Sequence, residues 1–206
     1  MYNPPAFAIS DRDEILAMAR AVPLALFVTA TVDGPMATPL PVYIDEEEGE
    51  QGTVYAHLAR ANPQWKTPLF GDGLFVFSGP DAYVTPSWYA SKQEHGKVVP
   101  TWNYEAVHLR GPVEFFEDAD RLHAIVTRLT DRHERERHEP WAVTDAPATF
   151  IAAQLRGIIG LRMPIATLSA KRKMSQNRAE ADREGVRRGL AESGEMKDRA
   201  VADLIG

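Results

Sequence analysis

The segment that decides the fold reads ALFVTATV (25–32), Asp33-Gly34 and then PMATPLPVYI (35–44). The first run is apolar and rich in β-branched residues, and an Asp-Gly pair between two such runs indicates a tight hairpin. The second run therefore predicts the returning strand. Its prolines at positions 39 and 41 have no N–H for a ladder, so this strand is expected at an edge, at a bulge or within a site.

More strands follow this hairpin at short spacing. Strand patterns are found in TVYAHLA (53–59), LFVFS (74–78), AYVTP (82–86), VHLRGPVEFF (107–116) and IIGLRMPIATLSA (158–170). Most of the connections are too short for the helical crossover that parallel strands need, which favours antiparallel pairing.

Helices are predicted around these strands. The first spans about 11–21, with Ser10 as N-cap, and stops before Pro23. Others are expected over 62–70, 118–135 and 146–157. The sequence thus predicts an α+β, mainly β protein with a single domain over 1–206, of which 170–206 forms a polar C-terminal loop and helices.

Composition excludes several classes of protein. The 206 residues include no cysteine, which rules out a disulfide scaffold or a cysteine-ligated zinc site. No apolar run is long enough to span a bilayer, and the N-terminus lacks the pattern of a signal peptide, so we expect a cytoplasmic protein without a membrane partner. The net charge of −6 argues against a broad nucleic-acid-binding surface. The acidic run DEEEGE (45–50) is interpreted as a solvated hairpin loop.

A first candidate site lies where the strand over 53–59 runs into a predicted helix. His57, Arg60 and Asn62 surround this junction. The free N–H groups of a helix start can hold a phosphate. In the alternative interpretation, Asn62 only caps the helix and Trp65 packs in the core.

Two further segments are unusual in composition. The runs YVTPSWY (83–89) and VPTWNY (99–104) combine aromatic rings with hydroxyl and amide groups, which suits a flat heterocycle. A dimer interface or a core cluster is an equal alternative. The run KRKMSQNR (171–178) offers hydrogen-bond donors and acceptors, or is only a polar connector.

Together, HLARANPQW (57–65), YVTPSWY with VPTWNYEAVHLRG (83–111) and KMSQNR (173–178) resemble the PaiB-type family of FMN-binding negative transcriptional regulators. The resemblance covers nearly the whole chain. It implies a six-stranded antiparallel split β-barrel related to pyridoxamine-phosphate oxidases. It also implies FMN as the cofactor and a homodimer with FMN at the subunit interface.

The resemblance also implies roles for particular residues. Thr38 stands where the oxidases have an arginine, so phosphate binding must rely on Arg60, His57 or the tail lysines. The partner subunit would place Trp102, Asn103 and Trp88 beside the ring. The full set of implied cofactor contacts is Thr38, Pro39, Leu40, His57, Arg60, Asn62, Gln64, Trp88, Trp102, Asn103, Lys173, Ser175, Gln176 and Asn177.

Three functions remain open on these grounds. The first is a transcriptional regulator that acts through flavin binding, although the charge does not support direct DNA contact. The second is an FMN-dependent reductase or oxidase, because the flavin itself carries the hydride chemistry. The third is a haem-binding relative on the same fold, with His57 or His108 as the ligand.

Overall fold

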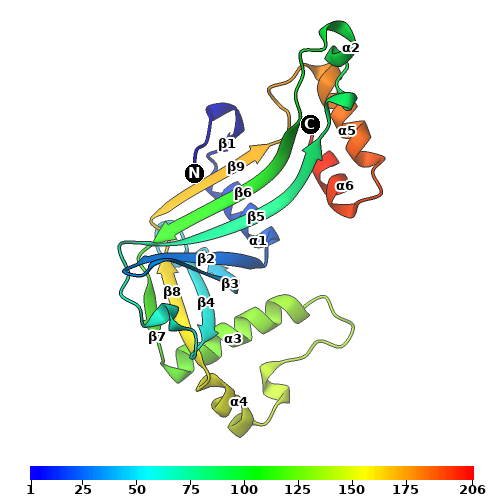
Figure 1. Ribbon diagram of the computed structural model, residues 1–206. Helices are drawn as coiled ribbons and strands as arrows, with labels where there is room; N and C mark the ends of the chain where they lie inside the picture. The colour runs from blue at the N-terminus through cyan, green and yellow to red at the C-terminus, as the bar shows by residue number, and fades with distance from the viewer. The chain divides into compact units, whose positions relative to one another are not determined.

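The computed structural model describes residues 1–206 as an α+β fold with one large antiparallel sheet (Figure 1). Nine strands pair in the order β1-β9-β6-β5-β2-β3-β4-β8-β7, where six were expected. The strands are β1 (Ala8–Ile9), β2 (Leu24–Thr31), β3 (Gly34–Asp45), β4 (Thr53–Ala59), β5 (Gly73–Val84), β6 (Thr101–Gly111), β7 (Glu114–Phe116), β8 (Ile158–Pro164) and β9 (Thr167–Lys173).

Six α-helices and four short 3-10 turns complete the chain. The helices are α1 (Arg12–Ala21), α2 (Ser91–His95), α3 (Ala119–Glu134), α4 (Ala148–Leu155), α5 (Glu180–Ala191) and α6 (Met196–Ala202). The 3-10 turns are η1 (Pro5–Phe7), η2 (Pro63–Trp65), η3 (Pro86–Trp88) and η4 (Val143–Asp145). None of the helices is both long and apolar enough to cross a membrane.

The chain divides into two compact units. Unit 1 comprises Met1–Met18, Ser78–Val107 and Ser169–Gly206, and unit 2 comprises Ala19–Phe77 and His108–Leu168. Strands β5 and β6 each have residues in both units. The interpretation of the chain as one domain stays a prediction.

The β2–β3 hairpin is confirmed. Thr31 pairs with Gly34, so Val32 and Asp33 form the two-residue loop, and Gly34 takes a φ of +104° that only glycine adopts easily. The Thr31 hydroxyl donates to the Gly34 carbonyl oxygen at 2.7 Å and closes the turn. A local signal of two residues therefore sets the register of the whole hairpin.

The prolines of β3 lie where the strand has one neighbour. Residues 34–41 pair with β2, whereas pairing with β4 begins at Val42. The Val42 N–H donates to the Pro23 carbonyl oxygen at 3.3 Å. By the alternation of an antiparallel ladder, Pro39 and Pro41 point their nitrogens away from β2. The proline-containing half of β3 is thus an edge, as one of the sequence alternatives states.

Several predicted boundaries were wrong. The strands expected over 74–78 and 82–86 form the single strand β5, while the strand over 107–116 is divided between β6 and β7 at Pro112. The strand over 158–170 is likewise divided between β8 and β9 after Pro164. The helix expected over 62–70 is only the three-residue turn η2. Asp11, not Ser10, caps α1 by accepting from the Glu14 N–H at 2.8 Å.

In unit 2, helix α3 packs on strands β3, β4 and β8. Helix α4 also contacts α3 and is drawn below it in Figure 1. Asp118 caps α3 by accepting from the Arg121 N–H at 2.8 Å. The apolar stripe of the helix buries Leu122, Ile125 and Leu129, as its spacing predicts. This packing fixes the positions of β4 and β8, which carry His57 and its neighbours.

Unit 1 has its own core, and the C-terminal helices supply much of it. Val186 and Leu190 of α5 and Val201 of α6 are fully buried together with Ala82 and Val84 of β5. Residues 170–206 thus include the expected helices, α5 and α6, and these helices also contribute to the core. The polar composition of the tail reflects its outer faces, whereas its apolar minority packs inward.

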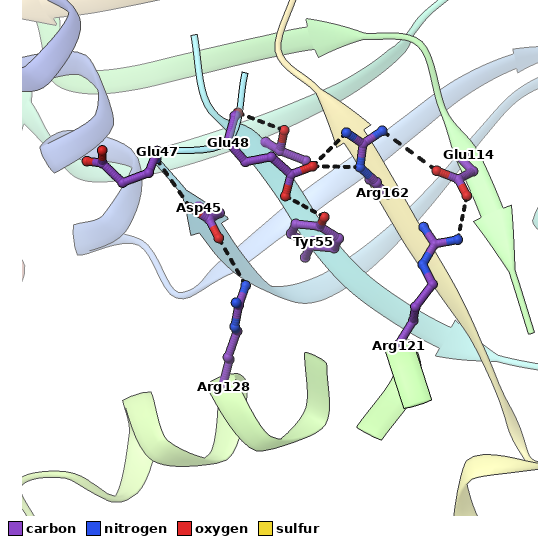
Figure 2. A network of polar contacts seen from close by, with 9 residues as sticks. Asp45, Glu47, Glu48, Tyr55, Glu114, Arg121, Arg128 and Arg162 are labelled. Atoms are coloured by element: carbon purple, nitrogen blue, oxygen red, sulfur yellow. Dashed lines mark hydrogen bonds and ion pairs between the residues drawn. The ribbon is translucent and has the colours of Figure 1, made fainter. Parts of the chain in front are cut away.

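The acidic loop between β3 and β4 is a hairpin loop, as expected. It is not simply solvated, because hydrogen bonds from β4 and β8 hold one of its carboxylates. Glu48 accepts hydrogen bonds from Arg162 Nε at 2.8 Å and from the Tyr55 hydroxyl at 2.6 Å, as Figure 2 shows. Arg162 also lies 3.7 Å from Glu114. Burial raises the pKa of Glu48, but the hydrogen bonds from Tyr55 and Arg162 outweigh it and hold this pKa below its ordinary value.

This network predicts a pH-dependent contribution to stability. Because the pKa of Glu48 is lowered in the folded state, its contribution is present above pH 4.5 and is lost as the pH falls below it. Glu48→Gln is expected to unfold at lower urea than the native chain at pH 7, and the difference is expected to shrink in acid. Glu50→Gln, in the same loop but exposed, is the control. A difference that persists unchanged at pH 3 would contradict this role of the carboxylate.

Candidate functional site

The first group of candidate residues in unit 2 forms a closed hydrogen-bond cluster, here called the Thr38 cluster (Thr29, Thr38, Asn62 and Gln64). The Thr38 hydroxyl donates to Gln64 Oε1 at 2.6 Å and accepts from Asn62 Nδ2 at 3.0 Å. Gln64 is fully buried, and its Nε2 donates to the Thr29 hydroxyl at 3.0 Å. Asn62 Oδ1 accepts from the Gln64 N–H at 2.9 Å, which confirms Asn62 as the cap.

The Thr38 cluster joins β2, β3 and the turn after β4. Its side-chain amides bond to the two threonine hydroxyls and to backbone groups, so they fix the shape of the 62–65 turn and leave few groups for a ligand. A single 3-10 turn also lacks the aligned peptide dipoles of a long helix, so it attracts a phosphate group less than the expected helix start would. Of the other β3 candidates, Leu40 is buried in the core and Pro39 is exposed.

His57 and Arg60 have contrasting environments. His57 lies on β4 opposite Gly160, and its buried Nδ1 has no hydrogen-bond partner. Burial lowers the pKa of His57, so the ring is neutral at pH 7. Arg60 forms an ion pair with Glu117 and donates to the Arg156 carbonyl oxygen at 2.6 Å. Arg60 thus has protein partners in the structure, and its role in phosphate binding stays a prediction.

His108, the other expected haem ligand, lies on β6. Burial lowers its pKa as well, which keeps the imidazole neutral, the form that binds metal. No group of three or more His, Cys, Asp or Glu side chains is arranged to hold a metal ion.

The second group of candidates lies in unit 1 and is here called the Asn103 cluster (Thr101, Trp102, Asn103, Lys173 and Ser175). Lys173 Nζ donates to the Thr101 hydroxyl at 2.6 Å and to the Trp102 carbonyl oxygen. Ser175 Oγ donates to Asn103 Oδ1 at 3.1 Å. The Asn103 side chain is fully buried, yet its Nδ2 has no partner.

The backbone at Ser175 is held in an unusual conformation. Its φ of +62° lies in the left-handed region, the one such case among the non-glycine residues. Strain of this kind persists only where surrounding contacts impose it, and it is common at functional sites. Here the buried Ser175 hydroxyl donates to the Asn103 side-chain oxygen, while the Asn103 Nδ2 has no partner.

The two tryptophans of unit 1 differ in exposure. Trp102 is 49% exposed and packs edge-to-face on Tyr83, with ring centroids 6.0 Å apart. Trp88 packs on α5 instead: a Cβ added at Gly189 would lie 2.3 Å from the indole. The structure therefore brings Trp102 to a surface where a ring could stack, whereas Trp88 anchors a helix.

The remaining candidates lie in the loop after β9. Gln176 Oε1 accepts from the Met174 N–H, and its Nε2 donates to the Arg172 carbonyl oxygen, each at 2.6 Å, so this side chain shapes the turn. Asn177 is exposed. Sequence reasoning did not list Thr29 or Thr101 as a candidate contact. Thr101 lies within the VPTWNY motif, but nothing marks Thr29 in its strand.

These groups fit a flavin in chemical character. A flavin presents carbonyl oxygens and ring nitrogens that accept hydrogen bonds, and the unpaired Asn103 Nδ2 is a buried donor. Trp102 and Tyr83 offer exposed aromatic faces. For a phosphate, Lys66 lies beside the 62–65 turn, with Nζ 4.8 Å from the centre of the Trp65 ring.

Comparison with known sequences identifies relatives. Residues 1–167 match the family described as "Putative FMN-binding domain". The chain is 31% identical over 206 residues to the protease synthase and sporulation protein PAI 2 of Bacillus subtilis (strain 168), covering 100% of this chain and 96% of that protein.

Solved structures share the fold at low identity. The flavocytochrome Anf3 of Azotobacter vinelandii superposes with a TM-score of 0.57 at 20% identity, covering 81% of this chain and 69% of that one. An FAD- and haem-binding protein of Mycobacterium smegmatis also gives 0.57, at 17% identity, over 81% and 73% of the chains. These flavoproteins support the split-barrel fold.

Proposed function

Since the chain belongs to the FMN-binding domain family, we propose that it binds FMN as a split-barrel homodimer. The observation that carries the proposal is the unpaired, fully buried Asn103 Nδ2, aimed by a strained Ser175. An unsatisfied buried donor costs free energy, and an acceptor atom of the cofactor would remove that cost. Bound FMN would supply hydride and electron-transfer chemistry.

We assign different tasks to the two clusters. The Thr38 cluster holds the turn that ends β4 in one shape, so that the backbone there is organised before the cofactor arrives. His57, neutral and with an unpaired Nδ1, and Lys66 complete the polar contacts on unit 2. The Asn103 cluster, contributed by the partner subunit, supplies the ring contacts through Trp102 and Asn103.

An apolar outer face on β2 and β3 supports the homodimer. Leu24 is 58% and Leu26 38% exposed, and their partners in the ladder are Pro41 and Pro39. Alternating strand residues place these four side chains on one face. A contiguous apolar sheet face of this kind marks an interaction surface, and a symmetric dimer would cover it with its own copy.

Regulation is proposed to act through this flavin site. The chain carries a net charge of −6, which disfavours a broad DNA-binding surface. A flavin-dependent change in conformation or partner would transmit the signal without direct contact to the operator. Salt-sensitive, sequence-specific DNA binding by the purified dimer would contradict this route, and NAD(P)H oxidation by the FMN-loaded protein would favour the enzymatic alternative.

The central experiment is a titration of purified protein with FMN. Flavin fluorescence is expected to be quenched on binding, and the chain of 22.9 kDa is expected to sediment as a dimer. Asn103→Ala removes the unpaired donor and is expected to weaken FMN about tenfold, the value of one hydrogen bond to a buried acceptor. Asn62→Ala is expected to weaken FMN binding as well, because Asn62 caps the 62–65 turn and its loss loosens that turn.

Gln154→Ala is the control, because this glutamine is exposed on α4 and is not among the candidate cofactor contacts. Its effect on FMN binding is expected to stay within about twofold. Absence of FMN binding by the native chain, or equal losses for Asn103→Ala and Gln154→Ala, would refute the assignment. A Soret band in the purified protein would favour the haem alternative.

A further inference from the structure

Four arginines line one pocket of unit 2, between β3 and α3. The pocket has a volume of about 440 Å³, within the range of small-molecule sites. Three of the arginines recur along α3 every three or four residues, so they share one face of the helix. The lining comprises Arg20, Tyr43, Ile44, Arg128, Asp131, Arg132 and Arg135. None of these residues belongs to the Thr38 cluster.

Carboxylates pair with two of the four guanidinium groups. Arg128 forms an ion pair with Asp45, drawn in Figure 2, and the two side chains lie 3.0 Å apart. Arg20 forms an ion pair with Glu46. Asp131 also lines the pocket, and Arg128 further interacts with Glu48, so the carboxylates gather around Arg20 and Arg128. No ion pair joins Arg132 or Arg135 to a carboxylate.

The arginines without a carboxylate partner lie next to each other. Arg132 donates to the Val42 carbonyl oxygen at 2.9 Å and to the Arg20 carbonyl oxygen, which fixes its guanidinium against the end of α1. It is partly buried, and burial together with the nearby Arg20 lowers its pKa. Arg135, one turn further along α3, is exposed. An incoming anion would stabilise a fixed, half-buried guanidinium that has no counter-charge.

The Tyr43 ring forms an aromatic wall beside these arginines. It is half-buried, with the Arg128 guanidinium 5.1 Å from its centre. Ile44 follows it on β3 and is buried, because alternate strand residues turn to opposite faces. A bare inorganic anion would not use this wall. An anion that carries an organic group would bury that group against it.

We propose that this pocket binds a phosphate ester, with the phosphoryl group held by Arg20, Arg132 and Arg135. The planar fork of arginine matches the oxygens of a phosphoryl group, to which it donates two hydrogen bonds at once. The organic part lies against the Tyr43 ring. The pocket is a site separate from the flavin contacts proposed above and does not depend on them.

The test is calorimetric titration of the full chain with phenyl phosphate and, in parallel, with inorganic phosphate. Phenyl phosphate is expected to bind more tightly than inorganic phosphate. Arg135→Gln is expected to weaken it about tenfold, the loss of a charge-assisted contact. Arg135 is exposed, so this variant is expected to fold; Arg20→Gln is a second variant with the same expected direction.

Arg137→Gln is the control, because this arginine follows α3, pairs with Glu134 at 3.1 Å and does not line the pocket. It removes the same charge and is expected to change phenyl phosphate binding by less than about twofold, as exposed charges are screened by salt. Absence of phenyl phosphate binding overturns the proposal. So does equal binding of the two probes, or an equal loss in Arg135→Gln and Arg137→Gln.

Discussion

Gly185→Ala is expected to destabilise the protein by about 2–3 kcal/mol, although alanine is the better helix former. Gly185 lies within α5, and a Cβ added there would lie 2.0 Å from the Trp88 carbonyl oxygen. The substitution gains up to about 1 kcal/mol in helix propensity. The clash is with a backbone atom that cannot rotate away, so overpacking exceeds that gain and α5 must move off η3.

Urea unfolding followed by circular dichroism measures this loss, which corresponds to a fall in Tm of roughly 5–10 °C for a chain of this length. Gly194→Ala is the control, because a Cβ there would meet no atom within 4 Å. It is expected to change stability by less than about 1 kcal/mol. Equal stability of the two variants would show that α5 does not rest on the Trp88 backbone.

Gln64→Met is expected to lower the free energy of unfolding by about 3 kcal/mol and to weaken FMN binding as well. Methionine keeps the unbranched shape of the buried side chain, so the change removes hydrogen bonds rather than volume. Thr38 loses its acceptor, and Thr29 and the Met36 carbonyl oxygen lose a donor. Each buried polar group left unsatisfied costs about 1–3 kcal/mol.

The measurements are urea unfolding and FMN titration of the same preparation. Gln154→Met provides the control, because Gln154 is exposed on α4. That variant is expected to stay within about 0.5 kcal/mol of the native chain. If Gln64→Met were as stable as the control, the Thr38 cluster would not hold the turn after β4. If it were unstable but bound FMN normally, the cluster would be structural only.

Sequence reasoning identified some of the residues that these two substitutions affect, but not the long-range contacts between them. Gln64 and Asn62 were identified from the NPQW run and the family resemblance, because capping is a local event within three residues. Their partner Thr29 could not be identified, since it meets Gln64 across a separation of 35 residues. Gly185 and Trp88 are still further apart in sequence, and their contact carries no local signal.

Local chemistry explains which elements were predicted well. The β2–β3 hairpin, β4 and α3 depend on a turn glycine, strand alternation and a capped apolar stripe, all readable within about a dozen residues. The breaks at Pro112 and Pro164 and the continuity of β5 through Pro80 were missed. A proline ends a strand only where its nitrogen faces a neighbour, and the neighbour is set by the tertiary pairing.

The sequence by itself determined the α+β class, the central hairpin, the family and the residue types of the candidate site, because these follow from short-range patterns. Only the tertiary structure decided how those residues are used. In the structure, Arg60 pairs with Glu117, Trp88 packs on α5, and Asn103 Nδ2 has no partner. The structure also gathers arginines from α1 and α3 around one pocket. Hydrogen bonding and burial depend on which distant segments meet, and that is fixed when the core packs.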